Sequence, residues 1–199
     1  MSDFFILDFI DPDRKASSFK GTTYNSDSEE IEQIFNDGVS LQGKLKLPFL
    51  TILDDRRSTV KAIKDRIYFR SNAGGVWLIS KKAKVFLDSL NLPLEFFPIN
   101  IKGKKTEIEN YFLVNVIGKI KCVDFEKSDV DYNKEYNYIE WIDSLSIDES
   151  KVPPETDVFL LGEYRAMFVI VSSRIKEAIE EEGLSGFVFR KPEEYSFMG

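Results

Sequence analysis

The chain has 199 residues, 43% of them hydrophobic and 31% charged, with a net charge of −7 and a pI near 4.9. This composition is that of an ordinary globular protein, and the length suits one large domain or two small lobes. The negative balance argues against a general nucleic-acid binder and against adhesion to anionic lipid, because both need Lys and Arg to meet phosphate. Either solubility or a basic protein partner explains the acidic surface.

The chain contains no histidine and a single cysteine, Cys122. The commonest general base and metal ligand is therefore missing, which excludes a Ser-His-Asp or Cys-His enzyme. Cys122 lies in an apolar run, where we expect a buried structural thiol. Residues 1–7 lack the basic and long apolar parts of a secretion signal, and the longest apolar runs are too short to cross a bilayer. We therefore expect a cytoplasmic protein.

The first third of the chain predicts one strand and two helices. Residues 4–10 have the pattern of a strand, which ends at the strong turn signal of residues 11–13. Residues 28–37 carry apolar side chains at helical spacing, with serines available as N-cap and Gly38 to end the helix. Residues 57–65 form a weaker helical stretch that continues into an apolar segment.

A more informative pattern, consisting of a strand, a serine N-cap, a helix and a second strand, occurs twice. In the first copy its parts are residues 76–79, Ser80, residues 81–90 and residues 94–99. In the second copy they are residues 167–171, Ser172 or Ser173, residues 174–182 and residues 186–189. Both copies place a serine twelve residues before a leucine, at Ser80 and Leu92 and at Ser172 and Leu184. A duplication explains this, and so do two ordinary β-α-β units, because caps recur for local reasons.

Further strands are predicted between and beside the two copies. Residues 111–116 and 119–123 are predicted strands joined at Gly118, and residues 157–161 predict a hairpin with the chain from Tyr164 onward. Strands outnumber helices, which favours an α+β fold with a mixed, mostly antiparallel sheet and a few helices packed on it. We expect a single domain covering residues 1–199, either undivided or built from two lobes, 1–75 and 76–199.

Three glycine-containing motifs are better explained as turns than as sites. The segment Gly183–Gly186 follows a predicted helix, whereas a nucleophile elbow must follow a strand. Residues 103–106 resemble the end of a phosphate-binding loop but lack its leading glycine. Residues 72–75 have the composition of a hairpin turn.

Two acidic runs are candidate sites. The first consists of Asp124, Glu126, Asp129 and Asp131. Its carboxylates can hold Mg²⁺ or Ca²⁺ or divide acid and base roles, although a solvated loop explains the same run. The second consists of Glu180, Glu181 and Glu182. It ends a predicted helix, where the macrodipole disfavours negative charge, so it marks either a partner surface or simply an exposed helix end. Apart from Asp124, we take these residues as candidates for binding a partner.

Three segments of the second half carry a resemblance to a known family. They are Tyr111–Val116 continuing through Asp124 to Ser128, Phe159–Leu161 leading into Val169–Ser172, and Gly183–Phe189. Through them, residues 75–190 resemble the immunity proteins of bacterial polymorphic toxin systems, a family first catalogued as a domain of unknown function. The first half is similar only in general layout. The signature positions that the resemblance indicates are Asn115, Asp124, Ser128, Ser172, Gly183 and Gly186.

The resemblance implies a cytoplasmic protein that binds one cognate toxin and blocks it, without turnover and without a cofactor. The acidic balance suits a basic toxin such as a nuclease, because opposite potentials steer association. Each signature position also has a structural explanation as a cap, a turn or a backbone contact. Two other functions stay open: a carboxylate-based, metal-dependent enzyme built around Asp124, and a regulatory or scaffold domain that binds through the β-α-β copies.

Overall fold

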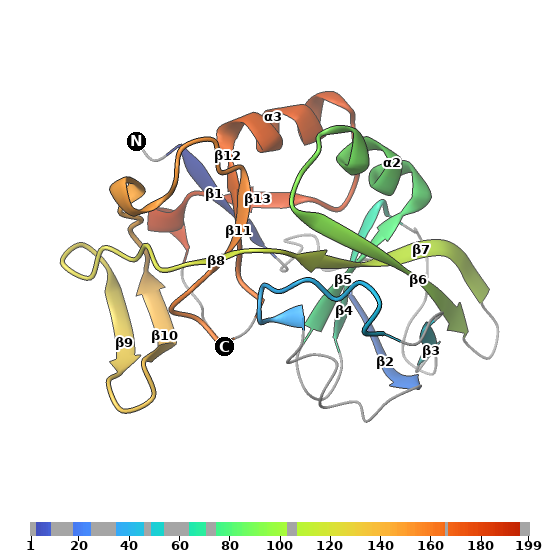
Figure 1. The fold of residues 1–199 in the computed structure, drawn as a ribbon, viewed down its shortest axis with the longest axis horizontal. Coiled ribbons are helices and arrows are strands. Elements are labelled where there is room, and N and C mark those ends of the chain that lie inside the picture. The colour runs from blue at the N-terminus through green and yellow to red at the C-terminus, as the bar shows by residue number, and fades with distance from the viewer. Residues whose placement is uncertain are drawn as a thin grey trace.

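The computed structural model describes residues 3–8, 18–24, 35–45, 49–53, 64–70, 75–102, 107–165 and 167–195. Within these residues the strands form a closed barrel, an open five-stranded sheet and a two-stranded hairpin (Figure 1). Two α-helices lie along one side of the molecule, at the top of Figure 1. Pairing is mostly antiparallel, which confirms the predicted α+β fold with a mixed sheet.

The barrel contains most of the strands from the first half of the chain. Around its wall the strands are β2 (Ser18–Tyr24), β3 (Phe49–Leu53), β6 (Leu94–Lys102), β7 (Glu107–Val116), β5 (Gly75–Ser80) and β4 (Arg66–Arg70). Burial alternates along β6, because successive side chains of a strand point to opposite faces. The inward side chains, among them Phe97 and Ile99, join the larger of two hydrophobic cores.

The open sheet combines the beginning of the chain with its second half. Its strands, in order across the sheet, are β13 (Val188–Arg190), β1 (Phe4–Asp8), β12 (Val169–Ser172), β11 (Val158–Leu161) and β8 (Lys119–Ile120). All four residues of β11 are buried, because the sheet separates the two cores. Val158 and Leu160 pack in the larger core, whereas Phe159 and Leu161 pack in the smaller one.

The hairpin of β9 (Asp129–Asn133) and β10 (Tyr138–Ser144) projects from the open sheet, at the lower left of Figure 1. Its inward residues Ile139 and Ile142 are buried in the smaller core. Two short 3₁₀ helices, η1 (Glu149–Lys151) and η2 (Pro192–Glu194), complete the described secondary structure.

The two helices follow the predicted serine caps. In α2 (Lys81–Ser89) the amide of Ala83 donates to Ser80 Oγ at 3.2 Å, and in α3 (Ser173–Glu181) the amide of Ile175 donates to Ser172 Oγ at 3.4 Å. Both helices keep to the predicted bounds within one residue at each end. Each buries a short apolar face, because its inward residues lie four positions apart, at Ala83 and Leu87 and at Ile175 and Ile179.

The barrel and the open sheet repeat one strand arrangement. The barrel order β6-β7-β5-β4-β2 matches the sheet order β13-β1-β12-β11-β8. In each series three antiparallel pairs are followed by one parallel pair, β4 with β2 and β11 with β8. Both β-α-β units also have a strand inserted between their two strands. In the barrel β7 lies between β5 and β6, in the open sheet β1 lies between β12 and β13, and each inserted strand is antiparallel to both neighbours.

The repeat extends to individual side chains. Ser80 Oγ donates to Asp65 Oδ1 at 2.7 Å, and Ser172 Oγ donates to Asp157 Oδ1 at 2.6 Å. In both places the serine amide also donates to the backbone oxygen of the same aspartate, fifteen positions earlier. After the helices, Asn91 and Gly183 both have positive φ, 53° and 67°. This agreement favours a duplication over two unrelated β-α-β units.

The structure corrects the bounds of two predicted strands. The strand predicted for residues 119–123 ends at Ile120, and as β8 it pairs with β11 in the open sheet. The predicted hairpin of residues 157–161 with the following chain is present as the antiparallel pair of β11 and β12, but β12 begins only at Val169 and not at Tyr164. The connection is longer than a two-residue turn because Tyr164 bridges to Ile139 of the hairpin instead.

Several other sequence predictions fall on residues outside the described ranges. These are most of the predicted helices at 28–37 and 57–65, the turn at 72–74 and the loop at 103–106. The strands on either side of residues 71–74 do pair antiparallel, with Arg70 opposite Gly75.

Candidate partner-binding surface

The projecting hairpin belongs to a larger structural unit, which we name the arm and define as residues 124–146. A β-bridge between Val123 and Ile147 closes its base. The buried carboxylate of Glu163 accepts hydrogen bonds from the amides of Cys122, at 3.3 Å, and Val123, at 3.0 Å. The backbone oxygen of Glu163 accepts from the amide of Ile139 at 2.7 Å. One residue of the main body therefore holds both the entry to the arm and its returning strand.

Two of the predicted signature residues shape the entry to the arm. The carboxylate of Asp124 accepts from the Glu126 amide at 3.2 Å and from Lys127 Nζ at 2.7 Å. The hydrogen bond from Lys127 lowers the pKa of the Asp124 carboxyl below its usual value. Ser128 Oγ accepts from the Ser146 amide at 2.8 Å, which joins the two sides of the arm. Asp124 and Ser128 thus organise a turn and a cross-connection at the base.

The arm carries most of the net charge of the protein. It contains seven Asp or Glu and two Lys, so it contributes −5 of the total of −7, and the other 176 residues contribute only −2. Once Asp124 is paired with Lys127, six carboxylates are left. These are Glu126, Asp129, Asp131, Glu135, Glu140 and Asp143. All six are exposed, and none forms an ion pair with another residue that the structure describes.

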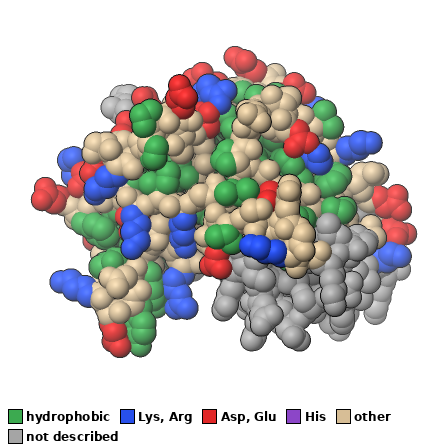
Figure 2. All heavy atoms as spheres, in the orientation of Figure 1, with side chains coloured by type: hydrophobic (Ala, Val, Ile, Leu, Met, Phe, Trp, Pro, Cys, Tyr) green, Lys and Arg blue, Asp and Glu red, His purple; other side chains and the backbone are tan. Residues whose placement is uncertain are grey.

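The arm also exposes aromatic side chains. Tyr136 has 64% of its surface exposed, and Phe125 has 47%. The ring centroids of Tyr136 and Tyr138 lie 6.3 Å apart, and the guanidinium carbon of Arg165 lies 4.7 Å from the Tyr138 centroid. Figure 2 shows the arm as a separate projection whose outer end carries hydrophobic and acidic side chains, whereas Lys and Arg lie along its flanks in this view. Aromatic and acidic groups therefore coincide at the tip.

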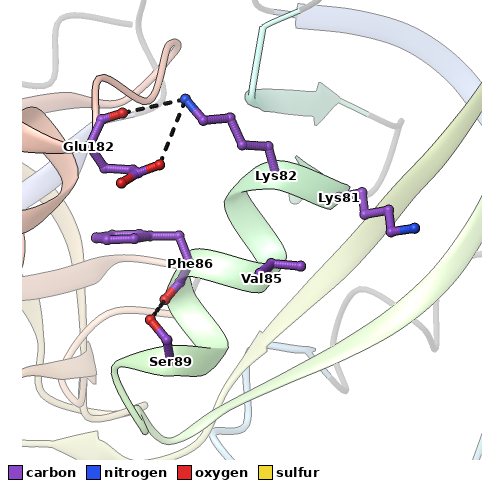
Figure 3. Close-up of a pocket in the computed structure, with 6 residues that line it drawn as sticks. All are labelled: Lys81, Lys82, Val85, Phe86, Ser89 and Glu182. Atoms are coloured by element: carbon purple, nitrogen blue, oxygen red, sulfur yellow. Dashed lines mark hydrogen bonds and ion pairs between the residues drawn. The ribbon is translucent and has the colours of Figure 1, made fainter.

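The second acidic run lies beside an open hollow of about 570 Å³. The hollow is lined by Lys81, Lys82, Val85, Phe86, Ser89 and Glu182. Figure 3 shows Lys82 reaching from α2 toward Glu182, whose carboxylate lies 4.0 Å and whose backbone oxygen lies 3.3 Å from Lys82 Nζ. Glu180 pairs with Lys176 at 2.5 Å, while Glu181 is exposed. Two of the three glutamates are thus engaged within the protein.

The other signature residues lie away from the arm. Asn115 is fully buried in β7, where its amide donates to the Val39 oxygen at 2.8 Å and to Glu95 Oε2 at 2.9 Å. Ser172 caps α3, and Gly183 ends it with a φ of 67°. A Cβ on Gly186 would lie 2.3 Å from the Arg66 backbone oxygen, so this position needs glycine for close packing of two chain segments.

The structure does not bring the first acidic run together around a metal position. Within the described part of the chain, no three Cys, Asp or Glu side chains converge as ligands. Cys122 is buried, as predicted, and burial raises the pKa of its thiol to about 12. No helix among the described residues is long and apolar enough to span a membrane.

A comparison with protein families now places the chain. Residues 13–194 match the immunity protein family Imm11. The chain belongs to this family. The Imm11 match includes most of the first half, for which the sequence resembled immunity proteins only in layout. It therefore covers all strands of the barrel and every strand of the open sheet except β1. No curated protein matches this Imm11 chain at a significant level.

Sequence reasoning missed several residues of the arm. They are Glu135, Glu140 and Asp143 among the acids, Tyr136 and Tyr138 among the aromatics, and the anchor Glu163. A signal was present, because acidic and aromatic residues are interspersed through residues 129–143 on both sides of a polar turn. No local signal identified Glu163, since its partners lie about 40 positions away.

Proposed function

We propose that this Imm11 protein is a cytoplasmic immunity protein that neutralises one cognate toxin by binding it, without catalysis and without a cofactor. Membership of the Imm11 family supports the immunity role. The observation that carries the proposal is the arm, with six exposed carboxylates that have no ion-pair partner among the described residues. Such unpaired charge on a projecting element suits a partner of opposite charge.

The charge distribution supports a toxin with a basic surface, such as a nuclease. A net charge maintained for solubility alone would have no reason to gather on one element, yet the arm holds −5 of −7. We assign the main toxin contact to Glu126, Asp129 and Asp131 and their neighbours on the arm. The glutamates at 180–182 are the weaker candidate, because two of them already pair with lysines.

We assign a structural role to the signature residues. Asn115, Ser172, Gly183 and Gly186 hold backbone segments in place by hydrogen bonding, capping or close packing. Asp124 and Ser128 act indirectly, because they shape the base from which the contacting carboxylates project.

Growth protection tests the proposal. The toxin domain encoded beside this gene is expressed in a sensitive bacterium together with the protein. We expect the unaltered protein to restore growth and the triple variant Glu126→Gln, Asp129→Asn, Asp131→Asn to protect poorly. The matched control is Glu180→Gln, Glu181→Gln, Glu182→Gln, which removes the same charge from α3 and its end and should protect fully.

Binding kinetics measured with a catalytically inactive toxin domain supply the second readout. Neutralising the arm should lower the association rate constant about tenfold at low salt and leave a smaller difference at high salt, because screening weakens steering. Equal rates for the arm variant and the unaltered protein, or a loss confined to the control variant, would contradict the assignment. Failure of the unaltered protein to bind or to protect would overturn the immunity function for this toxin.

A further inference from the structure

The arm tip combines three features that are rarely exposed together on a soluble protein. Tyr136 is the most exposed of the large hydrophobic side chains in the described residues. Tyr138 lies beside it, and the exposed carboxylates of Glu135 and Glu140 flank the pair in sequence. Single exposed apolar residues need no explanation, but an aromatic pair with an acidic rim at the end of a projection has the composition of an interaction site.

The tip is held in shape before any partner arrives. The amides of Glu135 and Tyr136 both donate to Asn133 Oδ1 at 3.1 Å, which fixes the turn. Tyr138 Oη donates to Glu140 Oε1 at 3.3 Å, and Asn133 Nδ2 donates to the same oxygen at 2.6 Å. A tyrosine on such a turn loses little conformational entropy on binding, because it has only two side-chain torsions to fix.

The tip already accommodates a guanidinium group. Arg165 lies over the ring of Tyr138 at 4.7 Å, within the range of a cation–π interaction. No described cationic side chain lies over Tyr136, and the exposed Glu135 directly precedes it in the chain. The ring of Tyr136 and the carboxylate of Glu135 are therefore available to a cation from outside, whereas one oxygen of Glu140 already accepts two hydrogen bonds within the tip.

From these features we propose that the arm tip is the energetic centre of the toxin interface, where Tyr136 receives an arginine or lysine side chain of the toxin between its ring and the neighbouring carboxylates. This inference rests on the proposed function and adds the contact residue and the chemistry of its occupant. The occupant is a cationic protein segment, because the arm carries −5 of the net −7 and its tip joins the proposed acidic contact. An aromatic ring with an acidic rim binds a cation through its face and its charge together.

The experiment measures association and dissociation rates of the inactive toxin domain with Tyr136→Ala, Tyr136→Phe and Val85→Ala. Val85 is the matched control, because it is 60% exposed and belongs to the other candidate surface, the hollow beside α2. We expect Tyr136→Ala to raise the dissociation rate constant at least tenfold with little change in the association rate constant. Tyr136→Phe keeps the aromatic face and should stay within twofold, as should Val85→Ala.

The outcomes separate this inference from the function on which it rests. Binding of Tyr136→Ala within twofold of the unaltered protein, or a larger loss for Val85→Ala, would overturn the inference and leave the immunity function standing. A tenfold loss for Tyr136→Phe would also overturn it, because the hydroxyl and not the ring face would then make the contact. Absence of binding by the unaltered protein would overturn both. Circular dichroism on each variant confirms that the fold is retained.

Discussion

The barrel and the open sheet share one strand order, and each contains one equivalent parallel pair, β2 with β4 and β8 with β11. They differ in the segment that follows β2 in the barrel and β8 in the sheet. After β2 the chain supplies β3, which pairs with β2 and β6 and closes the barrel. After β8, at the equivalent place, the chain supplies the arm, and the sheet stays open. The same scaffold thus receives an insertion at the same point twice, once for closure and once for a projection (Figure 1).

This difference gives the two repeats different roles, because the closed barrel supports the fold and the open sheet carries the proposed binding arm. Closure leaves the barrel without free strand edges, which suits a part of the protein that only supports the fold. The arm instead places carboxylates and tyrosines in solvent, held to the body by Glu163 and by the smaller core. Exposed, conformationally fixed side chains on a rigid support are what a recognition surface requires.

The contact that joins the two repeats should give the largest stability effect. Gly186 follows the second helix and lies against Arg66 of the barrel, with a φ of 86° and room for no Cβ. Gly186→Ala should lower the free energy of unfolding by roughly 3 kcal/mol, because backbone strain and overlap add. Urea unfolding checks this value.

Gly183 provides the control for that substitution. It also has positive φ, but nothing lies within 4 Å of its Cβ position. Gly183→Ala should cost about 1 kcal/mol, and Gly183→Asn should cost less, because the first repeat has Asn91 at the corresponding place. Equal losses at Gly186 and Gly183 would show that the close approach to Arg66 does not matter.

The anchor of the arm should have the next largest effect. Glu163→Ala removes the acceptor for the amides of Cys122 and Val123, and leaving buried donors unsatisfied should cost about 2 kcal/mol. Hydrogen exchange should accelerate at residues 122–123 and within the arm, while the barrel keeps its protection. Uniform acceleration in the barrel as well would mean that the two repeats do not open separately.

The serine caps test whether the two repeats are energetically equivalent. Ser80→Ala and Ser172→Ala should each lower the free energy of unfolding by about 1 kcal/mol, because each removes an N-cap acceptor. Thermal or urea unfolding of the two variants measures the comparison. If the losses in unfolding free energy of the two variants differ by more than the expected loss itself, the two caps do not contribute equally.

The smallest predicted effect depends on pH. Burial tends to raise the pKa of Asp157, but hydrogen bonds from Arg174 and Ser172 outweigh it and lower that pKa. A depressed folded-state pKa stabilises the protein above the unfolded-state pKa of about 3.9, and this contribution is lost as the pH falls through the folded value. Asp157→Asn should therefore be less stable than the unaltered protein at pH 7, with a gap that narrows in acid. If the difference in unfolding free energy between Asp157→Asn and the unaltered protein stays constant as the pH falls, the depressed pKa of Asp157 does not stabilise the fold.

The local features of the fold were the part that the sequence could predict. The serine caps, the two helices and the repeated strand–helix–strand pattern depend on neighbours a few positions away, so they could be found without the structure. The barrel closure and the open sheet depend on pairings such as β1 with β12, whose paired residues are separated by about 166 positions. The hairpin after β11 was predicted, but the start of its second strand was placed too early for the same reason, because Tyr164 pairs with a distant strand.

The candidate surface was only partly predictable. The acidic residues at 126–131 stood out as a run of charge, but their exposure and lack of ion pairs depend on the folded arrangement. Likewise, the run at 180–182 gave an equal signal in sequence, although Glu182 meets Lys82 from the other repeat. Tyr136 was overlooked because an aromatic residue near predicted strands is more often a core residue, and the sequence does not show which of the neighbouring aromatic side chains are exposed.

We propose that the arm, and not the surface around α2 and α3, contacts the toxin. Hydrogen–deuterium exchange of the protein alone and with an excess of the inactive toxin domain tests it most directly, because every amide reports at once. We expect protection on binding to be concentrated in residues 124–146, with the largest change at the turn around Tyr136. Protection confined to residues 81–89 and 173–182, with the arm exchanging as it does in the free protein, would contradict it.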